Sequence, residues 1–196
     1  MPGYKHIDNS ANYSRIIKQL KKSNSCCIAM YKNKEREKFI EFSQPPIIGL
    51  SNGVHILAKD IAKFKPFMDE EGRISIRALF NNSDLRMGIA KGRRYTGAVD
   101  QLTKKNQNSN KIYVYYKSDV FRGLIQLLET ERTIDYVIGH PQEIRWLTKH
   151  KIVEDKFFFI PIKELPPYVL AYVGCTKNEW GKKVINNNRY NSRRKL

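Results

Sequence analysis

Long hydrophobic runs are missing from this sequence. No stretch approaches the roughly 20 consecutive apolar residues that a membrane-spanning helix needs, and this excludes an integral membrane protein. Residues 1–6 contain no apolar core of the kind that a secretion signal has. We therefore expect a chain without a membrane span and, as written, without a secretion signal.

Motifs of catalysis, cofactor binding and metal binding are missing as well. The four histidines form no HExxH-type spacing, and there is no GxSxG elbow, no GxxxxGK[ST] loop and no GxGxxG after a strand. No two cysteines form the CxxC pair that is typical of structural zinc sites. We therefore expect no enzyme, no cofactor and no metal.

Cysteine is scarce, and the three present leave two interpretations open. Cys26 and Cys27 begin an apolar run that predicts a buried strand, and Cys175 lies far along the chain. Free cysteines behave as small apolar residues, so we expect three buried thiols. In the alternative interpretation, Cys26 or Cys27 bonds to Cys175 in an oxidising compartment.

Basic residues, by contrast, are abundant. The chain has 36 Lys and Arg against 19 Asp and Glu, a formal net charge of +17, which favours anionic partners. Six cations and no acids lie in residues 181–196, but elsewhere acids interrupt the cations, as in residues 34–38. A nucleic-acid interface typically has cations interleaved with aromatic residues, and no such stripe is evident. Nucleic acid is therefore an alternative partner and not the favoured one.

Hydrophobic periodicity predicts alternating helices and strands. The expected helices cover residues 14–22, 74–80, 95–105, 119–128 and 179–187, the fourth with a clear period of 3.6 residues, and a further helix begins at Pro141. The expected strands are short apolar runs at residues 26–31, 54–58, 86–90, 111–117, 135–139, 157–162 and 168–174. This alternation predicts an α/β fold with largely parallel sheets.

Four segments carry a more specific pattern. Residues 28–45 read IAMYKNKEREKFIEFSQP, residues 87–95 read MGIAKGRRY, residues 132–139 read RTIDYVIG and residues 180–186 read WGKKVIN. In this order they resemble segments of the type II periplasmic solute-binding proteins, in particular the amino-acid ABC-transporter-like binding proteins.

The resemblance implies a periplasmic-binding-protein-like type II fold. Two α/β lobes with mixed, mainly parallel sheets would be joined by two crossover strands, with the ligand held in the interlobe cleft. Lobe one would comprise residues 1–59 and 168–196, and lobe two residues 60–167. The family's first strand and helix have no counterpart here, and its closing helix is longer. We therefore expect an incomplete lobe one and a chain truncated at the N-terminus and at the C-terminus.

The resemblance also implies ligand-binding residues in lobe one. Arg36 aligns with the family's carboxylate-binding arginine, and a planar guanidinium can hold a carboxylate by two parallel hydrogen bonds. Without the resemblance, a surface arginine in a charged helix would be the better interpretation. Tyr31 and Asn33 stand where the family has small hydroxyl residues.

In lobe two the resemblance points to a turn and a helix start. Arg93, Arg94 and Tyr95 lie at the turn that usually faces the ligand, although an ordinary turn with exposed arginines would read the same way. His140 replaces the acid that binds the ligand's α-ammonium group, and Glu143 is the nearest substitute, although an acid there also complements a helix dipole. An anionic or aromatic solute suits this set better than a standard α-amino acid.

Together these features predict a protein that binds a small solute, an amino acid or another small carboxylate or anion, for transport or sensing. The resemblance implies a monomer, a periplasmic location and an ABC-transporter permease as partner, whereas a true start at Met1 would imply the cytoplasm. A basic nucleic-acid-binding protein and a non-functional remnant of a solute-binding protein are the alternatives.

Overall fold

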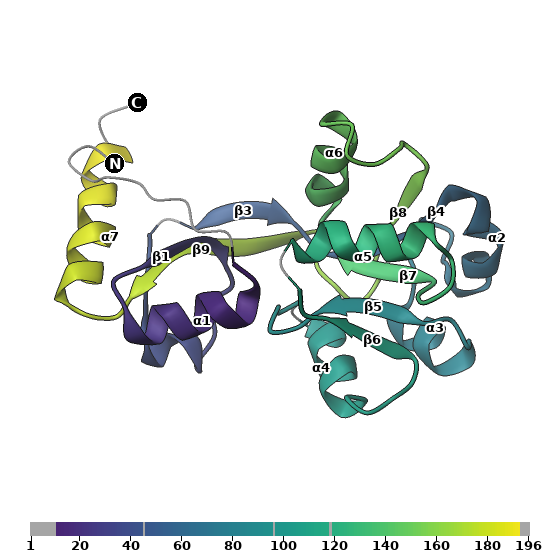
Figure 1. The fold of residues 1–196 in the computed structure, drawn as a ribbon, viewed down its shortest axis with the longest axis horizontal. Coiled ribbons are helices and arrows are strands. Elements are labelled where there is room, and N and C mark those ends of the chain that lie inside the picture. Colours follow the sequence, from purple (N-terminus) through teal and green to yellow (C-terminus); the bar gives the residue numbers. More distant parts are fainter. Residues whose placement is uncertain (1–10, 45, 96, 118, 193–196) are drawn as a thin grey trace. The chain divides into compact units, whose positions relative to one another are not determined.

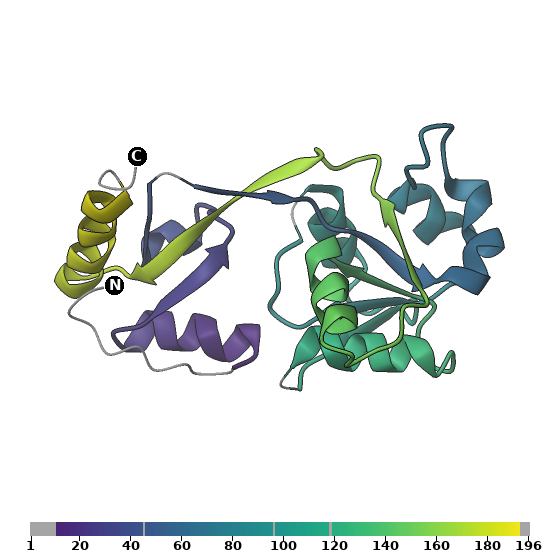
Figure 2. The ribbon, with the colours of Figure 1, turned by 90° about the horizontal axis from the view of Figure 1, so that it is seen from above.

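The computed structural model describes residues 11–44, 46–95, 97–117 and 119–192. It divides the chain into two compact units, unit 1 (Met1–Gly49 and Val169–Leu196) and unit 2 (Leu50–Tyr168). The chain crosses from one unit to the other in β3 (Ile47–Leu50) and returns in β9 (Tyr168–Thr176) (Figure 1). These two strands pair with each other, and their ribbons cross in the view of Figure 2. The α/β fold class and the two crossover strands are thereby confirmed.

Unit 1 is built from both ends of the described chain. Besides β3 and β9 it contains α1 (Tyr13–Lys22), β1 (Cys26–Met30), the 3-10 helix η1 (Arg36–Lys38), β2 (Ile40–Phe42) and α7 (Glu179–Ser192). Strands β1 and β2 flank β9, and both run antiparallel to it. The Asn12 side chain caps α1 by accepting from the backbone N–H of Arg15, and α1 buries Leu20 against Met30 and Phe42.

The close packing of α7 against β9 explains why the segment at residues 180–186 contains a glycine. A Cβ atom at Gly181 would lie 1.8 Å from the carbonyl oxygen of Thr176, so a glycine is needed for the helix to approach β9 this closely. The Asn178 side chain accepts from the backbone N–H of Gly181 at 2.9 Å. Trp180 then packs against the small core formed by Cys175, Val184 and Ile185.

The favoured interpretation of the cysteines was wrong. Cys26 and Cys175 form a disulfide that joins β1 to β9 across 149 residues, and Cys27 is the free thiol. The two bonded cysteines are direct partners in the antiparallel register, which places their side chains on the same face. Strand β1 also lies at the edge of the sheet with exposed side chains, and so it is not the buried core strand that its apolar residues suggested.

Unit 2 contains a five-stranded sheet in the order β6-β5-β7-β4-β8. Its strands are β4 (Gly53–Leu57), β5 (Met87–Ala90), β6 (Ile112–Tyr115), β7 (Tyr136–Gly139) and β8 (Phe157–Pro161). Its helices are η2 (Ala58–Asp60), α2 (Ile61–Phe64), η3 (Lys65–Phe67), α3 (Ile76–Asn82), α4 (Gly97–Lys105), α5 (Val120–Glu129) and α6 (Pro141–Lys149). Within the described ranges, no helix has the length and apolar character required to span a membrane.

Two sequence predictions need correction in unit 2. Among the strands that the structure describes in unit 2, parallel pairing is confined to β5 with its neighbours β6 and β7, and β4 runs antiparallel to both β7 and β8. The first unit boundary lies at residues 49/50 instead of 59/60, since β4 is a central strand of this sheet. The second boundary, predicted at residues 167/168, lies at 168/169.

The middle of the sheet buries a histidine. Every residue of β4, β5 and β7 is buried, as expected for strands covered on both faces. His55 in β4 is fully buried between the rings of Phe121 and Phe159, at 5.4 and 5.1 Å, and neither ring nitrogen has a hydrogen-bond partner. Burial lowers the pKa of His55 to about 4, so the fold holds this ring neutral.

We predict that the disulfide carries much of the stability of unit 1. Closing a loop this long restricts the unfolded chain, so Cys175→Ser should lower the free energy of unfolding by about 3–5 kcal/mol. The measurement is urea unfolding of a Trp146→Phe background, in which Trp180 next to Cys175 is the reporter. Cys27→Ser is the matched control and should leave the midpoint unchanged in oxidised protein. Equal unfolding of the two serine variants would contradict this prediction.

We also predict that acid destabilises the chain through His55. Because its pKa in the fold is about 4, the unfolded state binds more protons once the pH falls below its ordinary pKa. Between pH 7 and pH 5 the free energy of unfolding should drop by ~2 kcal/mol from this residue alone. His55→Phe should remove that part of the pH dependence in urea unfolding followed by circular dichroism. His150→Gln, at an exposed histidine, should retain it.

Candidate functional site

The three predicted residues of unit 1 lie together around η1. Arg36 begins this 3-10 helix and is only 7% exposed. Its Nη1 donates to the backbone carbonyl of Tyr31 at 2.9 Å, and its backbone N–H donates to Oδ1 of Asn33, also at 2.9 Å. Tyr31 is itself buried. Asn33 therefore holds the start of η1 while Tyr31 holds the guanidinium.

A buried arginine is unusual enough to need a reason. Arginine is rarely buried without partners, because the charge loses its hydration. The field of Arg36 reaches Cys27, where burial raises the pKa of the thiol and the arginine partly offsets that rise. The sequence suggested an exposed position for this arginine unless a ligand was involved, and the structure places it inside unit 1.

The predicted turn of unit 2 is anchored by Tyr95. Tyr95 is 1% exposed; its hydroxyl accepts from the backbone N–H of Ala90 at 2.6 Å, and its own backbone N–H donates to Oδ1 of Asp100 at 2.8 Å. Gly92 has a φ of 76°, a conformation that favours glycine. These contacts fix the residues between β5 and α4. Tyr95 thus has a positioning role in this turn.

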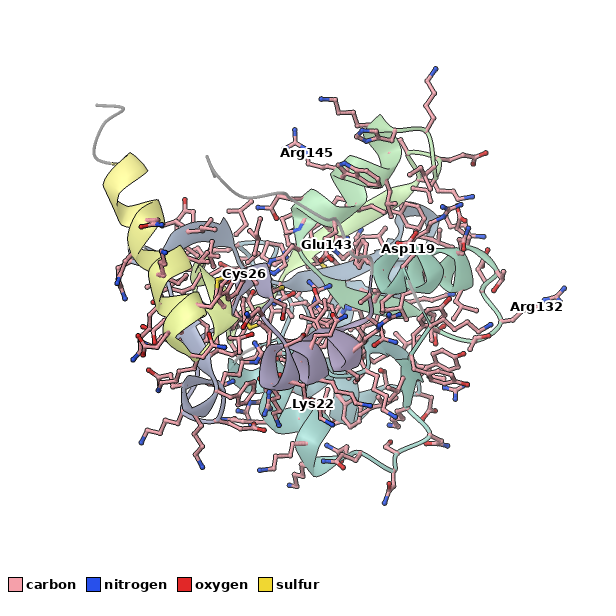
Figure 3. All side chains as sticks on the ribbon, turned by 60° about the vertical axis from the view of Figure 1, so that its left-hand side comes forward. Lys22, Cys26, Asp119, Arg132, Glu143 and Arg145 are labelled. Carbon is pink, nitrogen blue, oxygen red and sulfur yellow. A yellow bond between two sulfur atoms is a disulfide. The ribbon has the colours of Figure 1, made fainter. Side chains whose placement is uncertain are left out.

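Arg93 and Glu143 form a two-pronged ion pair in unit 2. Arg93 donates from Nη1 to Oε1 of Glu143 at 2.7 Å and from Nη2 to Oε2, and its side chain is 6% exposed. The guanidinium carbon also lies 5.3 Å from the centre of the Tyr95 ring. Glu143 lies near the start of α6, as labelled in Figure 3. The pair links the turn after β5 to the helix after β7.

His140 completes this group from the end of β7. Its backbone N–H donates to Oε2 of Glu143 at 2.8 Å, and its Nδ1 lies 2.7 Å from the carbonyl oxygen of Leu50. Burial, reinforced by the positive charge of Arg93, lowers the pKa of His140. Burial opposes the charge of Glu143 as well, but Arg93 and the His140 N–H outweigh it and hold the pKa of Glu143 below its usual range. The group is therefore a carboxylate and a guanidinium beside a neutral imidazole.

Sequence reasoning missed Asn52. It is 1% exposed, its Nδ2 donates to the carbonyl of Tyr95 at 3.2 Å, and its Oδ1 accepts from Nη2 of Arg93 at 3.4 Å. A polar residue just before a fully buried strand was the available signal. Asn52 therefore helps to orient Arg93.

Arg94 is the predicted residue that stands apart. Its side chain is 40% exposed, and Nη1 lies 3.9 Å from Oδ2 of Asp100, at the outer limit for an ion pair. Side-chain and backbone contacts thus bring Arg93, Tyr95, His140 and Glu143 into one group in unit 2, with Arg94 beside it. Within the described ranges, no three His, Cys, Asp or Glu side chains gather in a way that could hold a metal ion.

Sequence comparison finds no matching family model and no matching curated protein. Structural comparison gives a consistent answer. A substrate-binding protein of an amino acid ABC transporter from Streptococcus pneumoniae, bound to L-arginine, aligns with 96% of this chain and 71% of its own at a TM-score of 0.61 and 14% identity. The chain has the fold of the type II periplasmic solute-binding proteins.

Two further structures with this fold are similar to the same extent. A putative L-cystine ABC transporter protein from Listeria monocytogenes covers 96% of this chain and 73% of its own, with a TM-score of 0.62 and 19% identity. A protein from a study of glutathione import in Streptococcus mutans covers 97% and 72%, with a TM-score of 0.63 and 14% identity. At such low identity the comparison establishes the solute-binding-protein fold alone. The ligand has to be inferred from the residues of this chain.

We predict that Arg93 and Glu143 depend on each other for the stability of the fold, so that losing one charge is worse than losing both. Glu143→Gln leaves a buried guanidinium without its counter-charge and should destabilise the chain by about 3 kcal/mol. The double variant Arg93→Met, Glu143→Gln removes both charges and should be more stable than the single variants Arg93→Met and Glu143→Gln in urea unfolding. Two single losses that simply add up in the double variant would contradict this coupling.

Proposed function

We propose that this chain binds a small solute carrying a carboxylate, for transport or sensing, with Arg36 as the carboxylate-binding residue. The observation that carries the proposal is the burial of Arg36 at the position where the family motif has its binding arginine. A pre-oriented guanidinium loses little side-chain entropy on binding, and its planar geometry matches a carboxylate.

The contacts of Arg36 support this role. The Tyr31 carbonyl accepts from one amino group of the guanidinium, and the short helix η1 fixes the backbone beneath it. A carbonyl carries no net charge, so this contact orients the guanidinium without adding a counter-charge.

The group in unit 2 narrows the choice of solute. Glu143 would be the group to bind an α-ammonium, but Arg93 already satisfies it with two hydrogen bonds and His140 adds a third. A ligand ammonium would have to displace a buried arginine. We therefore propose a small carboxylate or an aromatic acid in preference to a zwitterionic α-amino acid, although the structures similar to this chain include one with bound L-arginine.

Location and partner are part of the same proposal. The Cys26–Cys175 disulfide supports an oxidising compartment such as the periplasm or the cell exterior, because cytosolic reductants keep such thiols reduced. A permease of the ABC-transporter type would then receive the solute. The comparisons do not favour the alternatives of a nucleic-acid-binding protein or a non-functional remnant.

The test is thermal unfolding against a panel of amino acids, organic acids and short peptides, each acid paired with its amide. We expect at least one acid to raise the melting temperature while its amide does not. Arg36→Ala should weaken binding of that acid by roughly 10- to 100-fold, the loss expected for a charge-assisted pair of ~1.5–3 kcal/mol. Isothermal titration measures the change.

Two matched variants make the test specific. Arg36→Lys keeps the charge but not the planar fork and should recover only part of the affinity. Arg15→Ala removes an exposed arginine of α1 and should bind as the original chain does. Flat melting curves with every ligand, from a protein that melts cooperatively, would overturn the proposal.

A further inference from the structure

A hollow lies in unit 2, between α6 and β8. Its volume is about 620 Å³, within the range of about 300–1,000 Å³ that is usual for small-molecule sites. Its walls are formed by Pro141, Ile144, Arg145, Trp146, Thr148, Lys149, Asp155, Phe157, Phe158 and Phe159. None of these residues belongs to the candidate site described above.

Aromatic rings dominate the walls of this hollow. Trp146 is 54% exposed and Phe158 is 45% exposed, the kind of apolar exposure that a folded chain usually keeps small. The indole of Trp146 stacks on the ring of His150 at 4.3 Å, and Nδ1 of His150 lies 2.8 Å from the Trp146 carbonyl oxygen. A half-exposed indole is thus held in one orientation before any ligand arrives.

The hollow also reaches the edge of the sheet. β8 is the outer strand, and the side chains of a strand alternate between its faces. Phe159 lies with His55 on the face that meets α5, so Phe158 belongs to the opposite face. Since both line the hollow, it follows the edge of β8 and is open enough for a flat molecule to enter from the side.

Two cations of α6 give the hollow its charge preference. The side chains of Arg145 and Lys149, one helical turn apart, make no hydrogen bond or ion pair with any part of the chain that the structure describes. Figure 3 shows Arg145 projecting outward from α6. Asp155 is the one acid in the walls, so the lining carries a net positive charge.

We propose that this hollow is a binding site for a small planar aromatic carboxylate. The flat apolar part of such a molecule would stack against Trp146 and the phenylalanines of β8, where burial of apolar surface supplies the main driving force. Its carboxylate would pair with Arg145 and Lys149, two cations that reach a common anion from one face of α6. This site is independent of Arg36 and of the proposed solute site.

Cinnamate is a suitable probe, and Trp146 is a built-in reporter. In a Trp180→Phe background Trp146 is the remaining tryptophan. We expect cinnamate to quench its fluorescence saturably and to give a matching binding isotherm by calorimetry. Cinnamamide, which has the same ring without the charge, and acetate, which has the charge without the ring, should both bind much more weakly.

Variants then assign the site. Arg145→Gln with Lys149→Gln should weaken cinnamate binding by about tenfold or more, a change equivalent to about 1.4 kcal/mol. Trp146→Ala, made with Trp180 intact and followed by calorimetry, should abolish the binding, with circular dichroism melting as a check that the variant folds. Arg132→Gln, at an exposed arginine elsewhere in unit 2, and Arg36→Ala should both leave the affinity unchanged.

Three results would overturn the proposal. The first is the absence of binding at millimolar cinnamate. The second is retained affinity in both the cation variant and the tryptophan variant, which would place the ligand elsewhere. The third is loss of cinnamate binding in Arg36→Ala, which would assign the aromatic acid to the proposed solute site and leave the hollow without a ligand.

Discussion

The pairing of β9 with its neighbours is the constraint on which unit 1 depends. β9 receives β1 and β2 on its two sides and pairs with β3 along the crossover, so segments from both ends of the chain meet on one strand. The hydrogen bonds of β9 close loops of well over a hundred residues, which is costly in chain entropy. The Cys26–Cys175 disulfide closes one of the longest of these loops, with a sequence separation of 149. Arg36 and η1 precede β2, and so the candidate carboxylate site depends on β9 as well.

The main constraint in unit 2 is the placement of charged side chains inside a large apolar core. The core extends across the sheet and its covering helices, and a lone charge within it would be strongly unfavourable. Arg93 is tolerated there because Glu143, Asn52 and the ring of Tyr95 all contact it. Such an arrangement contributes little net stability compared with an apolar replacement, which favours a functional explanation for it. Glu143 is an ionised carboxylate whose charge is already paired with Arg93. It therefore does not offer the free carboxylate that the ammonium group of a ligand would need.

Local signals in the sequence predicted the elements well and the pairings poorly. The 3.6-residue period of residues 119–128 gave α5 nearly to its observed bounds, and the proline at position 141 gave the start of α6, because both depend on short-range rules. The antiparallel position of β4 and the cysteine pairing depend on contacts between distant segments, which periodicity does not encode. Arg36, Tyr31 and Asn33 contact one another around η1, and their role in ligand binding stays a prediction. Asn52 was missed because its role is visible only once Tyr95 and Arg93 are placed beside it.

The positions of the cations are more informative than their number. Many lysines and arginines lie at the surface beside acids, as Lys63 does with Asp60 and Arg73 with Asp69, and such exposed pairs say little about partners. Arg36 is buried, and Arg145 and Lys149 stand among aromatic rings. A cation held beside apolar surface attracts an anion more strongly than one in water, because less solvent screens it. The net charge of +17 first suggested a polyanion such as nucleic acid, whereas these positions favour small organic anions that combine a carboxylate with an apolar body.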